Sequence, residues 1–241
     1  MAQDEGKKIK PRAVIVGVGN GLSAALARRL APTYRLTLVA RSKTVLAQLA
    51  QELDADCAEL DASDPRAMAD LFSGLTQPPR VAIYNPSARV RGPVADLDPD
   101  AVRKAIDITA YGAFLMGQQA AKRMLDAPMV NGQRGTILFT GASAGVKGFP
   151  QSAAFAMGKF AQRGLAQSMA RELHPQGIHV AWINIDGGIR NPDRPERIDA
   201  DTNPDSMLDP DSIARAYLQL IEQDRTAWSD ELTLRPWVEK F

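Results

Sequence analysis

The stretch AVIVGVGNGLS, residues 13–23, decides the fold. Its first half, AVIVGV (13–18), is rich in β-branched residues and predicts a buried strand. Its second half is rich in glycine, and a helical pattern over 22–31 begins directly there. Glycines at a strand-to-helix turn let the backbone approach a pyrophosphate, whose charge then lies at the helix N-terminus. We therefore expect a nucleotide-binding turn, with a purely structural turn as the alternative, formed by Gly17, Gly19, Asn20, Gly21 and Leu22.

Outward from this turn, short apolar runs alternate with amphipathic segments. Such alternation, with nearly continuous apolar strands, predicts a parallel sheet covered by helices on both faces. No Gly/Ser linker divides the chain, so we expect one α/β domain over residues 1–241. The later strands are expected at 35–40, 57–62, 80–85, 135–141, 178–185 and 228–236. The later helices are expected at 42–53, 65–75, 99–125, 152–173 and 209–223.

Composition narrows the class of protein. The 29 Lys and Arg residues nearly balance the 28 Asp and Glu residues, which argues against a general nucleic-acid binder. The single cysteine, Cys57, cannot form an internal disulfide, and no Cys/His cluster has zinc spacing, so no metal is expected. The first eleven residues are polar and are expected to be flexible. No apolar run is long enough to span a membrane, so a cytoplasmic location without a membrane partner is expected.

The end of the second expected strand bears on the choice of cofactor. An acidic residue there would hydrogen-bond the ribose 2′-hydroxyl of NAD, whereas this chain has Arg41 followed by Ser42. An arginine suits the 2′-phosphate of NADP, and an ordinary surface arginine is the alternative. Asp61 and Ala62, which end the third expected strand, either contact the adenine or precede a helix as plain loop residues.

Together with these features, four further motifs resemble those of the short-chain dehydrogenase/reductase family. They are YNPSA (84–88), GTILFTGASAG (135–145), FAMGK (155–159) and INIDGG (183–188). The resemblance spans residues 11–236. It implies a Rossmann fold with a seven-stranded sheet, a nicotinamide cofactor and hydride transfer to or from a carbonyl or alcohol carbon of a small molecule. It also implies a homodimer or homotetramer packed through the helices at 103–125 and 152–173.

The catalytic set that the resemblance implies is altered in this chain. The family uses a tyrosine as general acid/base, a lysine four residues later, a serine that orients the substrate oxygen, and an asparagine that supports a proton relay. Lys159 matches the lysine, but Phe155 stands in place of the tyrosine. Ala142 takes the serine position, with Ser143 next to it, and Thr109 takes the asparagine position.

The cofactor motifs that the resemblance implies are present with changes. Ser23 replaces the third glycine of the phosphate motif. The usual Asn-Ala-Gly and Pro-Gly motifs have here become Asn85-Pro86-Ser87 and Asp186-Gly187. By this resemblance, cofactor contacts are also expected from Lys159 and Ile189. The polar, proline-rich segment at 187–207 is expected to be a lid over the substrate or a disordered stretch.

Phe155 has no ionisable proton, which leaves three hypotheses open. A positioned general acid is worth roughly 10²- to 10⁴-fold in rate, or about 3 to 5 kcal/mol of barrier. First, another hydroxyl could donate the proton, from Ser143, Ser152, Tyr84 or Tyr111. Second, the substrate could be an activated alkene or an iminium ion, which needs no such acid.

In the second hypothesis Asp186 could pair with an iminium cation, or it could be a plain turn residue. In the third, the chain binds NADP(H) for sensing or assembly and is catalytically weakened; a lyase or isomerase is a further option. The leading prediction is an NADP(H)-dependent oxidoreductase with a non-standard active site.

Overall fold

A sheet of parallel strands forms the centre of the computed structural model, which describes residues 10–191 and 193–239. The sheet has seven strands in the order β3-β2-β1-β4-β5-β6-β9. Their bounds are β1 Arg12–Val16, β2 Arg35–Ala40, β3 Asp56–Glu59, β4 Pro79–Tyr84, β5 Gly135–Thr140, β6 Ile178–Ile185 and β9 Glu231–Leu234. All six neighbouring pairs are parallel, which confirms the expected α/β fold with a seven-stranded sheet.

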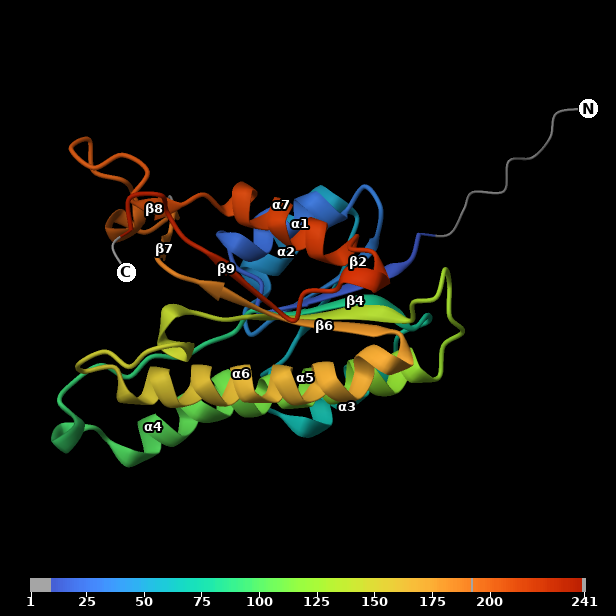
Figure 1. Cartoon of the computed structure of the whole chain (residues 1–241), viewed down its shortest axis with the longest axis horizontal. Coiled ribbons are helices and arrows are strands. Elements are labelled where there is room, and N and C mark those ends of the chain that lie inside the picture. Colours follow the sequence, from blue (N-terminus) through green and yellow to red (C-terminus); the bar gives the residue numbers. More distant parts are fainter. Residues whose placement is uncertain (1–9, 192, 240–241) are drawn as a thin grey trace, which may run out of the picture.

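Helices cover both faces of this sheet (Figure 1). One layer consists of α1 Leu22–Leu30, α2 Lys43–Leu53 and α7 Pro210–Ile221. The other consists of α3 Pro65–Ser73, α4 Pro99–Ile106, α5 Gly112–Leu125 and α6 Ala153–Leu173. Successive residues of β1 face opposite layers, since Ile15 packs in the core under α1 and Val14 in the core under α5. Both are fully buried, which explains why the strands are continuous apolar runs.

The strand order reverses at β1, and this reversal positions the site. β1 pairs with β2 on one side and with β4 on the other, so the chain leaves their carboxyl ends in opposite directions. Ligands of open α/β sheets bind in the crevice outside the carboxyl ends of the strands at such a point. The segments after β1, β4, β5 and β6 therefore border this crevice.

The helix expected at 99–125 is interrupted, which the sequence pattern did not predict. A π-helical turn, Asp107–Tyr111, separates α4 from α5. Two carbonyls in this turn accept hydrogen bonds from outside the helix: Tyr84 Oη donates to Ile108 O at 2.5 Å, and Gln162 Nε2 donates to Thr109 O at 3.2 Å. These bonds stabilise the wider turn, because they give the two carbonyls hydrogen-bond partners where the regular α-helical pattern is interrupted.

The segment expected to be an irregular lid has structure of its own. Within it, β7 Gly188–Ile189 pairs in parallel with β8 Met207–Leu208, and Pro195–Arg197 forms a short 3₁₀ turn. Arg190, directly after β7, forms ion pairs with Asp199 at 2.5 Å and with Asp209, directly after β8, at 3.0 Å. It therefore ties the middle of the segment to the residue that follows β8. Further 3₁₀ turns lie at Val94–Asp96, Ser143–Gly145, His174–Gln176 and Arg225–Ala227.

Two expectations concern the periphery of the chain. The expected flexible N-terminus lies largely outside the described residues, of which Lys10 is the first and donates to Ala31 O at 2.8 Å. None of the described helices is long and apolar enough to cross a membrane.

Candidate active site

The glycine-rich turn after β1 requires its first glycine. Gly17 has φ +86°, and a Cβ there would lie 2.7 Å from the ring of Pro86. Ser23 Oγ donates to Gly17 O at 2.9 Å and accepts from Asn85 Nδ2 at 2.5 Å. The serine that replaces the expected third glycine therefore ties the turn to the end of β4.

The outer side of this turn is open to the cleft. A Cβ on Gly19 would meet nothing within 4 Å, and no side chain caps the N-terminus of α1. The segment after β7 lies close by, since Asn20 Nδ2 donates to Asp193 Oδ2 at 2.6 Å and Asn191 lies 3.4 Å from the Cβ position of Gly21. An open glycine turn at an uncapped helix N-terminus fits a pyrophosphate.

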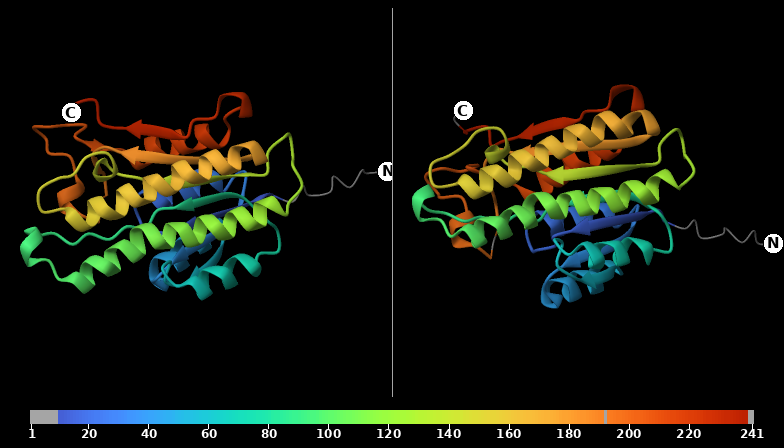
Figure 2. Two further views of the ribbon diagram at one scale, coloured as in Figure 1. Left: turned by 60° about the horizontal axis from the view of Figure 1, so that its bottom comes forward. Right: turned by 90° about the horizontal axis from the view of Figure 1, so that it is seen from below.

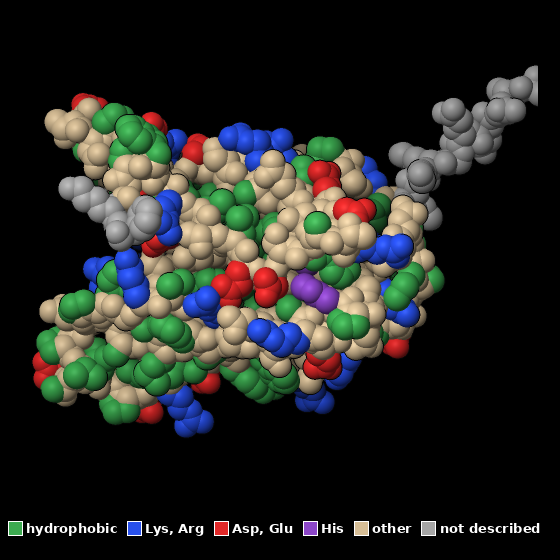
Figure 3. All heavy atoms as spheres, in the orientation of Figure 1, with side chains coloured by type: hydrophobic (Ala, Val, Ile, Leu, Met, Phe, Trp, Pro, Cys, Tyr) green, Lys and Arg blue, Asp and Glu red, His purple; other side chains and the backbone are tan. Residues whose placement is uncertain are grey.

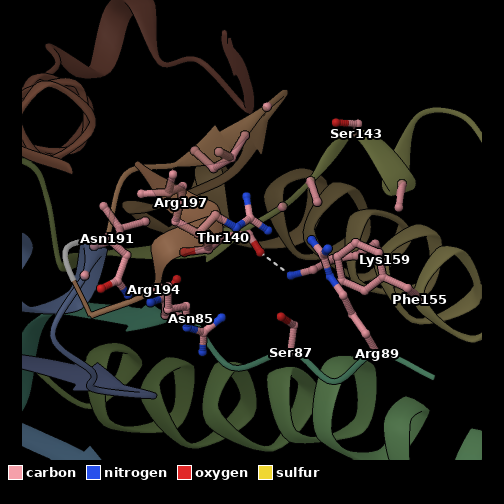
Figure 4. Close-up of a pocket in the computed structure, with 18 of the residues that line it drawn as sticks. Asn85, Ser87, Arg89, Thr140, Ser143, Phe155, Lys159, Asn191, Arg194 and Arg197 are labelled. Carbon is pink, nitrogen blue, oxygen red and sulfur yellow. Dashed lines mark hydrogen bonds between the residues drawn. The ribbon is translucent and has the colours of Figure 1, made fainter. Parts of the chain in front are cut away.

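A cleft of about 840 Å³ extends from the turn across the carboxyl ends of β4, β5 and β6 (Figure 4). Its walls also include the first turns of α6 and the segment after β7. The expected site residues that line it are Gly17, Gly19, Asn20, Gly21, Leu22, Asn85, Ser87, Ser143, Phe155, Lys159, Gly187 and Ile189. Residues far apart in the sequence thus share one hollow, as the family motifs imply.

Seven expected site residues do not line this cleft. They are Arg41, Ser42, Asp61, Ala62, Pro86, Thr109 and Asp186. Thr109 is completely buried, and its Oγ1 accepts from Ala88 N at 3.0 Å, so it supports the segment after β4 from beneath. Asp186 is buried and forms an ion pair with Arg235 at 3.3 Å. It therefore already has a cationic partner.

The end of the sheet beyond the cleft carries the residues expected near the adenine. Arg41 and Ser42 are exposed directly after β2. The Asp61 carboxylate accepts from Ser63 N at 2.9 Å and from Ser63 Oγ at 2.7 Å. These bonds lower the pKa of Asp61, with Arg41 adding a smaller effect through its charge. Asp61 thus bonds within the loop before α3, while Ala62 is buried.

Lys159 is a buried cation at the inner wall of the cleft. Its side chain comes from α6, and Nζ donates to Thr140 O at 2.5 Å and to Gln162 Oε1 at 3.3 Å (Figure 4). Burial, and then repulsion by Arg89, lowers the pKa of Lys159 to about 7. Its ammonium form can donate to a ligand oxygen placed beside it.

Phe155 lies one helical turn before Lys159 and is also almost buried. Its ring makes a cation–π contact with Arg89, whose guanidinium carbon lies 4.1 Å from the ring centroid. Figure 4 shows Arg89, Phe155 and Lys159 together on one side of the cleft. An apolar ring and two basic side chains thus stand together at this side of the cleft.

The candidate replacement donors differ in position. Tyr84 is buried and donates to Ile108 O, and burial raises the pKa of Tyr84 far above its usual range. Tyr111 stacks on Phe114 and does not line the cleft. Ser143 and Ser152 do line it, although Figure 4 shows Ser143 well apart from Lys159. Both tyrosines are therefore unsuited to proton delivery in this conformation.

The cleft also contains basic residues that the sequence analysis did not identify. Five arginines line it, with Asp193 as the one acidic residue among the described lining residues; the arginines are Arg89, Arg91, Arg190, Arg194 and Arg197. A signal was present in the doublet ARVR after the YNPSA motif and in the arginines of the 187–207 segment. The near-neutral net charge of the whole chain conceals this local excess.

Comparison with known proteins agrees with this geometry. A family model described as short chain dehydrogenase matches residues 11–194. A cyclic-di-GMP-binding biofilm dispersal mediator protein of Escherichia coli (strain K12) is 29% identical over 198 residues, which cover 79% of this chain and 74% of that protein. Alignments with two further curated dehydrogenases are shorter and span 40% and 37% of their lengths.

Solved structures match over nearly the whole chain. A short-chain dehydrogenase from Rhodopseudomonas palustris is 31% identical with a TM-score of 0.78, covering 94% of this chain and 99% of that one. A metagenomic short-chain oxidoreductase in complex with NADP is 24% identical with a TM-score of 0.80, covering 95% and 99%. This chain therefore belongs to the short-chain dehydrogenase family of NAD(P)H-dependent oxidoreductases.

Proposed function

We propose that this chain is an NADP(H)-dependent oxidoreductase that reduces a small molecule without a tyrosine general acid. The observation that carries the proposal is the pair Phe155 and Lys159, which line the same cleft as the glycine-rich turn. Lys159 keeps the family's lysine position, while the ring beside it has no proton to give. NADPH, when bound, supplies the hydride.

The cofactor residues are proposed from the family motifs and, for those that line it, from their place along the cleft. We assign the pyrophosphate to the turn Gly17–Leu22 and the nicotinamide half to the residues around Lys159, with the expected contacts of Asn85, Pro86, Ser87, Asp186, Gly187 and Ile189. Arg41 and Ser42 are assigned to the 2′-phosphate, and Asp61 and Ala62 to the adenine. The NADP complex of a structural relative supports this choice of cofactor.

The positive charge of the cleft bears on the choice between an iminium ion and an activated alkene, the two substrate classes that need no general acid. An iminium ion would meet Arg89 and Lys159, and Asp186 is already paired with Arg235. Like charges at close range are unfavourable, so we favour an activated alkene over an iminium ion. An alkene conjugated to a carbonyl accepts hydride at carbon and takes its proton afterwards from water, so Phe155 is compatible with that chemistry.

The assembly of the chain is proposed from its exposed apolar surface. Tyr111, Phe114, Met157 and Phe160 are 39–54% exposed on or beside α5 and α6. These two helices lie side by side on one face (Figure 2), and apolar side chains gather over α4 and α6 (Figure 3). An exposed apolar surface of this kind is typical of an interface. A homodimer or homotetramer through the helices at 103–125 and 152–173 is the arrangement that it supports.

The proposed function is tested by separating cofactor binding from turnover. NADPH binding is measured by fluorescence titration, and NADPH oxidation is then followed with panels of ketones, imines and activated alkenes. Binding with turnover of activated alkenes is the expected result. Absence of NADPH binding contradicts the proposal. Binding without any turnover identifies the chain as a weakened homologue with a sensing or assembly role.

A further inference from the structure

Four arginines face the cleft without a carboxylate partner in the described part of the chain. Arg190 is neutralised by Asp199 and Asp209, but within residues 10–191 and 193–239 no ion pair is formed by Arg89, Arg91, Arg194 or Arg197. The single acidic lining residue, Asp193, is hydrogen-bonded to Asn20 instead. The cleft therefore holds a local excess of positive charge.

These arginines come from two opposite walls. Arg89 and Arg91 belong to the segment after β4, whereas Arg194 and Arg197 belong to the segment after β7. Figure 4 shows Arg89 beside Phe155 on one side and Arg194 and Arg197 across the cleft on the other. Partial burial lowers the pKa of Arg89, and the charges of Arg197, Arg91 and Arg194 lower it further.

Such an arrangement is unfavourable for the protein alone. Converging guanidinium groups destabilise one another, and an anion between them converts that repulsion into charge-assisted hydrogen bonds. Guanidinium groups bind carboxylate and phosphate in a bidentate manner, and their planar shape makes them better suited to this than ammonium groups. The charge excess therefore points to an anionic ligand.

The cofactor's own phosphates are assigned elsewhere. The glycine-rich turn and the N-terminus of α1 fit the pyrophosphate, and Arg41 lies after β2, outside the cleft lining. Arg89 instead stacks on Phe155, at the position that the family gives to its proton donor. Arg89 thus borders the place where a substrate meets Lys159 and Phe155, and Arg194 and Arg197 face it from across the cleft.

We propose that Arg89 and Arg197, with Arg91 and Arg194, bind the anionic group of the substrate, a carboxylate or a phosphate. This inference deepens the proposed function and rests on it, because the bound anion is a substrate only if the chain is an oxidoreductase. It identifies the acceptor class as an anionic molecule. The aliphatic part of Arg89 and the ring of Phe155 provide an apolar wall beside that group.

Calorimetric titration tests the subsite with two anions and a neutral probe. The protein, free and saturated with NADPH, is titrated at low salt with succinate, with inorganic phosphate and with butane-1,4-diol. Binding of at least one anion but not of the diol is expected, and the tighter anion separates a carboxylate site from a phosphate site. Absence of binding by both anions in both forms overturns the subsite.

Three variants separate the subsite from the cofactor site. Arg89→Met and Arg197→Met keep the aliphatic part of the side chain but remove the charge, and each is expected to weaken anion binding about 10- to 100-fold. NADPH affinity is expected to change less than about threefold in both, because its phosphates are held elsewhere. Arg66→Met, on the exposed surface of α3, is the matched control and is expected to change neither.

The outcomes distinguish the two proposals. If both cleft variants weaken NADPH as much as the anions, the arginines hold the cofactor and the inference is overturned. If anion binding is as weakened by Arg66→Met as by the cleft variants, the effect is one of net charge and the inference is again overturned. If the wild type binds the anions but not NADPH, the proposed function fails while the anion subsite stands.

Discussion

The guanidinium carbon of Arg89 lies 4.1 Å from the centroid of the Phe155 ring. A cation over an aromatic face is stabilised by about 0.5–1 kcal/mol at exposed sites and more when desolvated. The Phe155 ring therefore has a stabilising contact with Arg89 and is more than a side chain that lacks a hydroxyl. Phe155 and Arg89 therefore form one feature of the site.

Substitution of Phe155 by tyrosine tests whether the remaining site can use a proton donor. Phe155→Tyr places a phenol one helical turn before Lys159 and against Arg89, and these cations favour its ionised form. Ketone reduction is expected to rise at least about 100-fold above wild type, the lower end of what a general acid supplies. The measurement is NADPH oxidation with a panel of neutral ketones.

The matched control for this substitution is Phe160→Tyr, on the same helix but 45% exposed, which is expected to leave the rate unchanged. Activity that stays at background in Phe155→Tyr and in the double variant with Ala142→Ser would show that the site is built for other chemistry.

Buried Lys159 makes folding stability depend on pH. Its pKa is about 7 in the folded protein, against roughly 10.4 for an unfolded lysine. Below about pH 7 both states are protonated, so the cost of the buried charge is fully present. Between about pH 7 and pH 10 the folded state releases a proton that the unfolded state keeps, and stability rises by at most roughly 1.4 kcal/mol per pH unit.

Lys159→Met removes this contribution and isolates it from other titrating groups. Urea unfolding of both proteins is compared across that pH range at constant ionic strength. The wild type is expected to gain stability relative to Lys159→Met as pH rises, and NADPH affinity is expected to fall at least about tenfold in the variant. Parallel stability curves for the two proteins would mean that Lys159 keeps an ordinary pKa.

The fold was largely predictable from the sequence, because buried parallel strands are continuous apolar runs. The strands at 35–40 and 178–185 agree with β2 and β6 at both ends. The π-helical turn Asp107–Tyr111 was not predictable, since it depends on hydrogen bonds from Tyr84 and Gln162, which come from other elements. Local pattern carries no record of such partners.

The candidate site was predictable where a motif is contiguous and hidden where it is assembled from distant segments. The glycine-rich turn and the pair Phe155 and Lys159 are contiguous, and the structure brings them to one cleft. Arg89 and Arg197 are more than a hundred residues apart and face the same cleft only because β4 and β6 end at the same edge of the sheet. In the sequence, each of them looks like any surface arginine.

Tyr84 is predicted to be a structural residue rather than a proton donor. Tyr84→Phe removes the hydrogen bond to Ile108 O and leaves a buried carbonyl with one partner fewer. The free energy of unfolding is expected to fall by about 1–2 kcal/mol, with turnover per folded molecule unchanged. Urea unfolding and NADPH oxidation are measured on the same preparation. A loss of turnover without a loss of stability would instead make Tyr84 the proton donor.

The exposed apolar residues of α6 are predicted to hold subunits together. Phe160→Glu places a charge in the surface formed with Met157, Tyr111 and Phe114, which an interface could bury only at high cost. Sedimentation velocity is expected to show a dimer or tetramer for the wild type and a smaller species for the variant. Trp237→Glu, at an 83% exposed position away from these helices, is the control and should keep the wild-type assembly. A monomeric wild type would remove the proposed interface.

Arg41 is predicted to set the preference for NADP(H) over NAD(H). It is exposed after β2, where an acidic residue would hydrogen-bond the ribose 2′-hydroxyl of NAD and repel a 2′-phosphate. Arg41→Asp is therefore expected to weaken NADPH binding at least about tenfold through loss of a charge-assisted bond and gain of repulsion, while NADH binds equally or more tightly.

Fluorescence titration with both dinucleotides measures the ratio of their affinities, and Arg29→Asp, exposed on α1, corrects for net charge. An unchanged ratio would place the 2′-phosphate against other residues, and the proximity of Arg41 to Asp61 would then be a purely structural feature of the loop.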